Sequence, residues 1–348
     1  MSRFSTHSRL DKRQPAARAF TLIELLVAIV IMLILVGVTV SVVNISLDGE
    51  RIRAGARDLQ SYLMGARDRA VHSKMARGVR FELDPNSDPT RPWVRSVVYI
   101  GASSDWQQGS ITVRRNGTNG RPELLRGEFT EWYALKLRGS LVNGARIKLG
   151  NRWYTVSTIP LTSVNNEWLH ISPPLVDPQP QDEPDPAFQN YPIVMRINEG
   201  DYRLELRPRV LPNAQAKQLP QGIVIDLAYC RVPSSTWKTA TSDRYRDVMF
   251  SPRGTVTGSA AAAGVIHFLL NEQADAESKL EPWLPANQGD KRVISLFTRT
   301  GNVTTSELFP YEDFDHDGQL DPGEDLNGNG QLDTESIFYY AERGEVSE

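Results

Sequence analysis

Carboxylate side chains recur at regular spacing in the segment 313–324, which reads DFDHDGQLDPGE. Aspartate occupies positions 1, 3, 5 and 9 of these twelve residues, and glutamate occupies position 12. Gly318 stands at position 6, where a sharp turn is needed if the oxygens are to surround one ion. Hard oxygen ligands in this order suit calcium. The predicted calcium ligands are Asp313, Asp315, Asp317, Asp321, Glu324 and the main-chain carbonyl of Gln319.

The next twelve residues, 325–336, repeat this pattern without a gap. Ser336 replaces the final glutamate, so we expect this second loop to bind calcium more weakly. Abutting loops with no room for a helix between them resemble the tandem EF-hand-like calcium repeats of secreted bacterial proteins and thrombospondin type 3 modules. The alternative is a solvated acidic tail, because residues 313–348 hold eleven acidic side chains and one arginine. The predicted ligands of the second loop are Asp325, Asn327, Asn329, Gln331 and Asp333.

A single carboxylate also stands in an otherwise apolar run near the N-terminus. The 24 residues 20–43 contain one charged side chain, Glu24, and the run is long enough to cross a bilayer. A carboxylate near the centre of a bilayer costs about 2.5–3.5 kcal/mol, so such groups usually have a partner. No lysine or arginine lies in the run. Cleavage before Phe20 would create an α-amino group for Glu24 of the same chain or of a neighbour, which would make Glu24 an assembly device.

The sequence RAFTLIELL at 18–26 resembles the leader and first mature residues of type IV prepilins and pseudopilins. The resemblance implies that a prepilin peptidase cuts between Ala19 and Phe20 and that Phe20 is N-methylated. It also implies that Glu24 guides assembly with other pilins or pseudopilins on an inner-membrane assembly platform. Ala19 departs from the family, which usually has glycine before the cut. The alternative is an ordinary signal-anchor helix whose glutamate lies near the lipid headgroups.

Charged residues before the apolar run set the expected orientation in the membrane. Residues 1–19 hold five basic side chains and one acidic side chain, and basic flanks favour the cytoplasmic side. We therefore expect a cytoplasmic leader over 1–19 and one transmembrane helix of the inner membrane over 20–43. The remaining residues should lie in the periplasm or outside the cell.

The composition is that of a folded chain, with 348 residues, 40% hydrophobic and 23% charged. The net charge of −3 gives no overall bias towards nucleic acid. Residues 51–80 are locally basic, which indicates a solvated helix face or, as the alternative, a patch for DNA or an acidic partner. No nucleotide-binding loop, serine nucleophile elbow or zinc-protease motif is present in the sequence, so we expect that the protein is not an enzyme.

Hydrophobic spacing predicts the elements that carry these sites. An amphipathic continuation of the helix is expected over 44–77, with Gly78 as the stop just past its end. From there the pattern has period two, as in VRFEL at 79–83, and ALKLRG at 134–139 also reads as a strand. NEGD at 198–201 reads as a hairpin turn. The apolar residues of the helical stripe are Ile45, Ile52, Ala56, Leu59, Leu63, Ala66 and Ala70.

The predicted fold class is therefore α+β, with a long N-terminal transmembrane and spine helix packed on an antiparallel β-sandwich-like domain. The β-rich domain should span 78–312 and contain a large insertion at about 85–245. The tandem loops at 313–336 and a C-terminal tail at 337–348 should follow it. One cysteine, Cys230, rules out a disulfide within the chain.

Two further stretches resemble GspH/FimT-type minor pseudopilins. ARDRA at 66–70 matches the end of the family's first helix, and FSPRG at 250–254 with TG at 300–301 matches its closing strands. The residues that carry the resemblance are Ala66, Arg67, Asp68, Arg69, Ala70, Phe250, Pro252, Gly254, Thr300 and Gly301.

The sequence favours a minor pseudopilin of a type II secretion pseudopilus, or a minor pilin of a type IV pilus. Its expected partners are the prepilin peptidase, other pilins or pseudopilins, the assembly platform and the membrane, and its expected cofactor is calcium. One alternative is a minor pilin that binds DNA or a secreted cargo. Another is a membrane-anchored calcium-binding surface protein that joins no filament.

Overall fold

The computed structural model describes most of the chain, and statements about structure refer to the described residues. Side chains at 36–48 are not described, although their backbone is helical. The predicted cleavage residues Ala19 and Phe20 lie outside the described part. The described residues are 22–161, 163, 167–176, 183–185, 187–239, 243–279, 281–283, 290–309, 311–313, 317–326, 330–334 and 336–343.

Helix α1 runs from Leu22 to Ser73 and has residues in both compact units of the chain, 1–50 and 51–348. In the second unit one face of the helix is buried. Six of the seven residues of the predicted stripe are at most 1% exposed, which confirms the periodicity, and the side chain of Ile45 is outside the described part. The helix ends earlier than expected, because Lys74 takes a left-handed conformation with φ 54° and reverses the chain.

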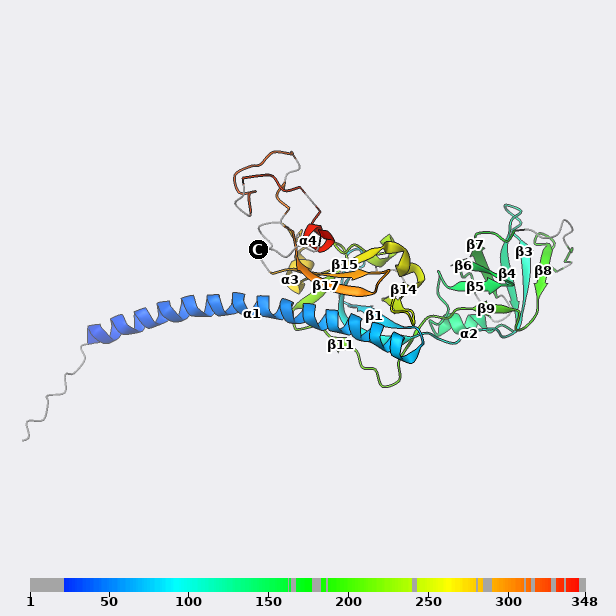
Figure 1. Cartoon of the computed structure of the whole chain (residues 1–348), viewed down its shortest axis with the longest axis horizontal. Coiled ribbons are helices and arrows are strands. Elements are labelled where there is room, and N and C mark those ends of the chain that lie inside the picture. Colours follow the sequence, from blue (N-terminus) through cyan, green and yellow to red (C-terminus); the bar gives the residue numbers. More distant parts are fainter. Residues whose placement is uncertain are drawn as a thin grey trace, which may run out of the picture. The chain divides into compact units, whose positions relative to one another are not determined.

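Ten strands in the described residues form a first antiparallel sheet (Figure 1). Its main order is β14-β13-β1-β2-β12-β15-β16-β17, and two short strands, β10 and β11, pair with β2. The strands are β1 (Arg77–Leu83), β2 (Trp93–Gly101), β10 (Arg209–Val210), β11 (Lys217–Gln218), β12 (Ile223–Asp226), β13 (Tyr245–Phe250), β14 (Val256–Thr257), β15 (Val265–Glu272), β16 (Arg292–Phe297) and β17 (Asn302–Glu307).

The buried face of α1 and this sheet form one apolar core. Leu59 and Leu63 of the helix belong to the same cluster as Phe81 of β1 and Phe268 of β15, whose rings stack with centroids 4.8 Å apart. Gly78 does not end the helix but lies in β1, where an added Cβ would come within 2.1 Å of the carbonyl oxygen of Val248 on β13. Glycine there permits close approach of neighbouring strands.

A second antiparallel sheet lies in the sequence between β2 and β10, and its order is β8-β3-β4-β7-β6-β5-β9. The two edge strands are joined by only four residues, and β9 also bridges to Trp106, just before β3. The sheet must therefore curl towards closure around its own apolar core. The strands are β3 (Ser110–Arg115), β4 (Pro122–Glu128), β5 (Arg146–Leu149), β6 (Arg152–Thr158), β7 (Trp168–Ser172), β8 (Ile193–Ile197) and β9 (Tyr202–Leu204).

Two local predictions in this second sheet are wrong. The stretch expected as a strand at 134–139 is mostly helix α2 (Trp132–Leu137), in which Trp132 and Leu135 are buried while Leu137 is 70% exposed. Burial at a spacing of three residues is helical rather than strand-like. The turn at 198–201 does not close a hairpin, since β8 pairs with β3 and β9 pairs with β5.

The α+β class is confirmed, with an N-terminal helix followed by antiparallel sheets. The remaining helices in the described residues are short. They are η1 (Ser235–Lys238), η2 (Gly258–Ala263), α3 (Gln273–Ser278) and α4 (Tyr339–Arg343).

Candidate functional sites

Glu24 lies in the first turn of α1, and its side chain is exposed in the isolated chain. A carboxylate in the first turn is favoured by the helix dipole. Its neighbours are apolar and also exposed, with Leu22 at 82% and Ile23 at 70%. Within the described residues no helical stretch is both long enough and apolar enough to span a membrane. The first turn thus presents one charge among exposed apolar side chains.

The segments 66–70, 250–254 and 300–301, where the sequence resembles minor pseudopilins, lie against one another. Gly254 follows β13 and Gly301 precedes β17, with φ angles of 82° and 66°. A Cβ added at Gly301 would lie 1.9 Å from the carbonyl oxygen of Gly254 and 3.1 Å from the side chain of Arg67 on α1. The two turns and the helix are therefore packed against one another at one place.

The acidic loops retain parts of the predicted calcium-loop geometry. Gly318 and Gly330, at position 6 of the two loops, have left-handed φ angles of 76° and 71°. In the second loop, the amide of Gly330 donates to Oδ2 of Asp325 at position 1, over 3.0 Å. Each loop turns where the sequence predicts, because only a residue free of a Cβ adopts this conformation at little cost.

The predicted ligands differ in burial and in how they are placed. Asp313 is 6% exposed and Glu324 is 5% exposed, whereas Asp317 and Asp321 are exposed to solvent. No three histidine, cysteine, aspartate or glutamate side chains in the described part of the chain are grouped so as to hold a metal ion. Asp315, Asn327 and Asn329 lie outside the described residues.

Asp313 has an unsatisfied oxygen in a buried carboxylate. Its Oδ1 is fully buried and has no hydrogen-bond partner among the described residues. An unsatisfied buried carboxylate oxygen is costly, and a bound cation would remove that cost. Burial and, second, the charge of Asp313 raise the pKa of the neighbouring Tyr311 phenol. In the sequence, the donor types of the first loop are carboxylates and a main-chain carbonyl, which are the oxygen ligands that calcium prefers.

Glu312, which sequence reasoning missed, connects the two loops. It is fully buried, and its oxygens accept the amide of Leu326 at 3.0 Å and the amide of Asp333 at 3.2 Å. Its own amide donates to the carbonyl oxygen of Asp333 at 3.0 Å. Glu312 stands one residue before the repeat, so a search restricted to the twelve-residue pattern does not include it.

The ends of the loop region are held by the first sheet. The amide of Phe309 donates to the carbonyl of Ile337 at 3.0 Å, and Phe338 belongs to the same core cluster as α1 and the sheet. Phe338 also stacks on His267 of β15, with ring centroids 4.6 Å apart. Helix α4 contacts β16 and β17, and Glu342 on it accepts a hydrogen bond from Arg231. The acidic loops thus lie between two segments that are attached to the first sheet and its core.

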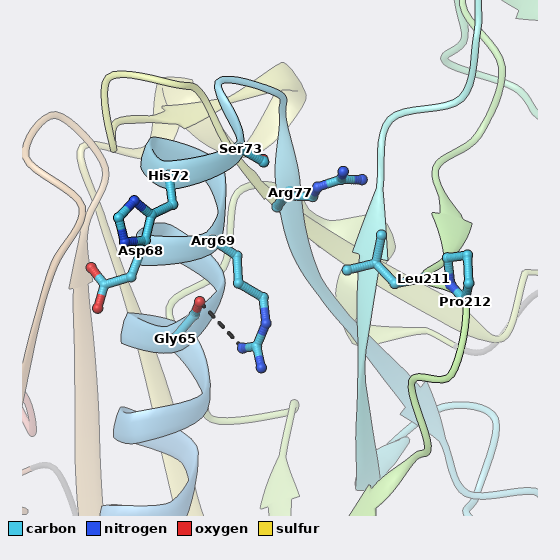
Figure 2. A pocket seen from close by; sticks show the side chains of 8 residues that line it. All are labelled: Gly65, Asp68, Arg69, His72, Ser73, Arg77, Leu211 and Pro212. Atoms are coloured by element: carbon cyan, nitrogen blue, oxygen red, sulfur yellow. Dashed lines mark hydrogen bonds between the residues drawn. The ribbon is translucent and has the colours of Figure 1, made fainter.

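A groove of 770 Å³ follows the basic part of α1 (Figure 2). Figure 2 shows the side chain of Arg69 extending from α1 on the side of Leu211 and Pro212, while Asp68 and His72 point to the other side of the helix. The guanidinium of Arg69 lies 3.8 Å from the centre of the Tyr99 ring. The groove is lined by Gly65, Asp68, Arg69, His72, Ser73, Arg77, Leu211 and Pro212.

Tyr99 lines a neighbouring pocket together with Arg69 and Tyr62. Tyr62 stacks on Tyr99 with centroids 3.8 Å apart, so Arg69 must cover the opposite face of the same ring. Both faces of the Tyr99 ring are therefore in contact with side chains of α1. Arg80, another basic residue of 51–80, is 7% exposed and pairs with Asp247 through two hydrogen bonds of 2.8 and 2.7 Å. That side chain has a structural role.

Comparison with known protein families finds a match at the N-terminus. The family described as the prokaryotic N-terminal methylation motif matches residues 15–40. The chain is pilin-like at its N-terminus. The motif implies processing by a prepilin peptidase and assembly with other pilin-like subunits, which are structural proteins. Neither the curated proteins nor the solved structures contain a match to the chain.

Proposed function

We propose that the protein is a minor pseudopilin or minor pilin, processed by prepilin peptidase and assembled through its N-terminal helix. The observation that carries the proposal is the methylation motif over residues 15–40, which includes the first part of α1. The same helix contributes its residues after Arg51 to the core of a β-rich domain. A helix that is an anchor at one end and part of a folded core at the other suits a subunit drawn from a membrane into a filament.

Processing is the first test of this proposal. In cells with an active prepilin peptidase, mass spectrometry of the purified protein should find a chain that begins at N-methylated Phe20. Cells without the peptidase should retain residues 1–19. The variant Ala19→Gly restores the residue usual before the cut and should be processed at least as completely. An intact leader in both strains would overturn the proposal.

Assembly through Glu24 is a separate test. Glu24→Leu removes a carboxylate whose burial in a bilayer is unfavourable, so membrane insertion should not suffer. If Glu24 pairs with the α-amino group of a neighbouring subunit, crosslinking to partner pilins should fall. Glu24→Gln is the matched variant, since it keeps the size of the side chain and loses its charge. Equal crosslinking in all three forms would exclude an assembly role for this carboxylate.

We also propose that the loops at 313–336 bind calcium, supported by the buried Oδ1 of Asp313 and by the left-handed glycines at position 6. In the first loop Asp313, Asp317, Asp321 and Glu324 would supply carboxylates, and Gln319 would supply its carbonyl. Calcium titrated into the full chain in detergent should release or absorb heat, and Glu324→Gln should weaken binding at least tenfold. Absence of any binding heat would identify the segment as a solvated acidic tail.

A further inference from the structure

We propose that the groove beside the C-terminal end of α1 binds an acidic peptide segment of a partner protein. Carboxylates of the peptide would lie on the arginines of the groove, and its apolar side chains would lie on the aliphatic wall. This ligand goes beyond the function proposed above and does not depend on calcium binding. All residues that line the groove belong to the compact unit 51–348.

Two arginines bring positive charge into the groove. Arg69 donates to the main-chain oxygen of Gly65 at 3.3 Å, and Arg77 donates to Sδ of Met75, a weak acceptor, at 3.8 Å. Neither guanidinium forms an ion pair with another of the described residues. Asp68, the acidic residue of the lining, points to the other side of α1 (Figure 2). Donors of both guanidinium groups are therefore available to a carboxylate, which arginine can bind through two parallel hydrogen bonds.

The position of Arg77 depends on a glycine in the neighbouring strand. A Cβ added at Gly101 of β2 would lie 2.2 Å from Nη1 of Arg77 and 2.8 Å from Cδ2 of Leu211, so these two side chains meet over the glycine. Gly101 pairs with Arg77 of β1 on one side and with Arg209 of β10 on the other. Directly opposed residues of neighbouring strands project to the same face of a sheet. The exposed Arg209 therefore adds a positive charge on the face that carries Arg77.

The opposite wall and the extension of the groove indicate the kind of ligand. Leu211 and Pro212 form an apolar wall on the side to which Arg69 extends (Figure 2). The same three residues also line a second pocket of 330 Å³, where Asn213 and Gln215 offer amide groups. The groove thus continues beyond the space that one small anion fills. A peptide can supply carboxylates for the arginines, apolar side chains for the wall and main-chain groups for the amides.

A single-stranded nucleic acid could use the same arginines, but such ligands also stack their bases on aromatic rings. Tyr99, the ring beside Arg69, is in contact with side chains of α1 on both faces. The wall opposite Arg69 is aliphatic. These contacts favour a peptide over a nucleic acid.

Fluorescence anisotropy with the full chain in detergent tests the proposal with defined probes. A labelled peptide of alternating glutamate and leucine should bind, and the matching peptide of lysine and leucine should not. Arg69→Gln and Arg77→Gln should each weaken binding of the acidic peptide about tenfold, because each removes a charge-assisted hydrogen bond. Arg152→Gln makes the same change of charge at an exposed position of β6 in the second sheet, and it should leave the affinity unaltered.

Gly101→Ala supplies a test that keeps every charge. The atoms nearest to its Cβ are the ends of flexible side chains, so the chain should fold, but the guanidinium of Arg77 must move. Binding of the acidic peptide should therefore weaken although the net charge is unchanged.

Three results would overturn the proposal. The first is a wild type that does not bind the acidic peptide, or arginine variants that bind it as well as the wild type does. The second is tighter binding of a labelled single-stranded oligodeoxynucleotide with the same loss in the arginine variants, which would assign the groove to nucleic acid. The third is displacement of the peptide by an equal concentration of inorganic phosphate, which would identify a site for small anions.

Discussion

His267 is a buried ionisable side chain whose surroundings keep it neutral. Its Nδ1 lies 2.7 Å from the hydroxyl of Ser295, Phe338 covers one face of the ring, and Nε2 lies 3.8 Å from a carboxylate oxygen of Glu342. Burial, followed by the positive charge of Arg231, lowers the pKa of His267 to about 4. The ordinary value is about 6.5, so the folded state binds its proton later than the unfolded state as the pH falls.

This shift predicts a pH dependence of stability. Between pH 6.5 and about 4 the unfolded chain carries the proton at His267 and the folded chain does not, so the free energy of unfolding should fall as the pH falls. The contribution of this residue is on the order of 3 kcal/mol across the window. Chemical denaturation at several pH values should show a smaller loss in His267→Gln than in the wild type. Identical pH profiles for the two proteins would contradict a neutral buried His267.

Gly301 is a second residue whose identity the packing dictates. Alanine there would combine a left-handed backbone, which costs about 1–2 kcal/mol, with a collision at 1.9 Å against the carbonyl of Gly254. Gly139 is the matched control, because its φ of 67° equals that of Gly301 within a degree and an added Cβ would meet no atom within 4 Å. Denaturant titration should find Gly301→Ala destabilised by clearly more than Gly139→Ala. Equal losses would show that the two turns can separate at little cost.

At the scale of elements, two neighbouring residues of helix α1 differ sharply in burial. Leu63 is fully buried in the core, and Met64, the next residue, is 39% exposed. Leu63→Ala should reduce the free energy of unfolding by about 2–5 kcal/mol, because it leaves a cavity between the helix and the sheet. Met64→Ala should change it by less than about 1 kcal/mol. If both variants lose the same stability, the face of α1 that packs on the sheet has been misassigned.

The sequence predicted elements well where one period continued over many residues. The stripe of α1 extends over five turns, so the helix and its buried face could be inferred without tertiary information. Helix α2 could not be inferred in this way, since Leu135, Lys136 and Leu137 alternate as in a strand. The burial of Trp132 together with Leu135, three residues apart, decides the outcome. The separation of β8 from β9 depends on closure of the whole sheet, which no local pattern encodes.

In the candidate sites, too, the sequence predicted features set by local spacing and did not predict features set by long-range contacts. Twelve-residue spacing predicted the turns at Gly318 and Gly330, because each is determined within its own loop. It did not predict Glu312, whose role depends on contacts with residues 14 and 21 positions later. Arg67, Gly254 and Gly301 lie in separate parts of the sequence that resemble minor pseudopilins. The fold shows that they pack against one another.

At the scale of the whole molecule, calcium bound in the acidic loops could stabilise the loops alone or the whole domain. The loop region leaves the first sheet at Phe309 and returns at Ile337, and Phe338 lies in the core that includes α1. A ligand that binds only the folded state stabilises whatever unfolds together with its site. Because both ends of the loops are attached to the core, we expect calcium to stabilise the domain and not the tail alone.

Thermal unfolding of the full chain in detergent, followed by the near-ultraviolet signal of its aromatic residues, tests this expectation. At a calcium concentration about 100 times the dissociation constant, the free energy of unfolding should rise by roughly 2.7 kcal/mol, and the midpoint should rise with it. Phe338→Ala should lower the midpoint without calcium, because it removes a core side chain, and should also abolish most of the response to calcium. Leu63→Ala also removes a core side chain, but from helix α1. It should therefore lower the unfolding midpoint and keep the full response of the midpoint to calcium. Loss of the response in both variants would indicate general destabilisation, and its retention in Phe338→Ala would show that the loops do not communicate with the core through this anchor.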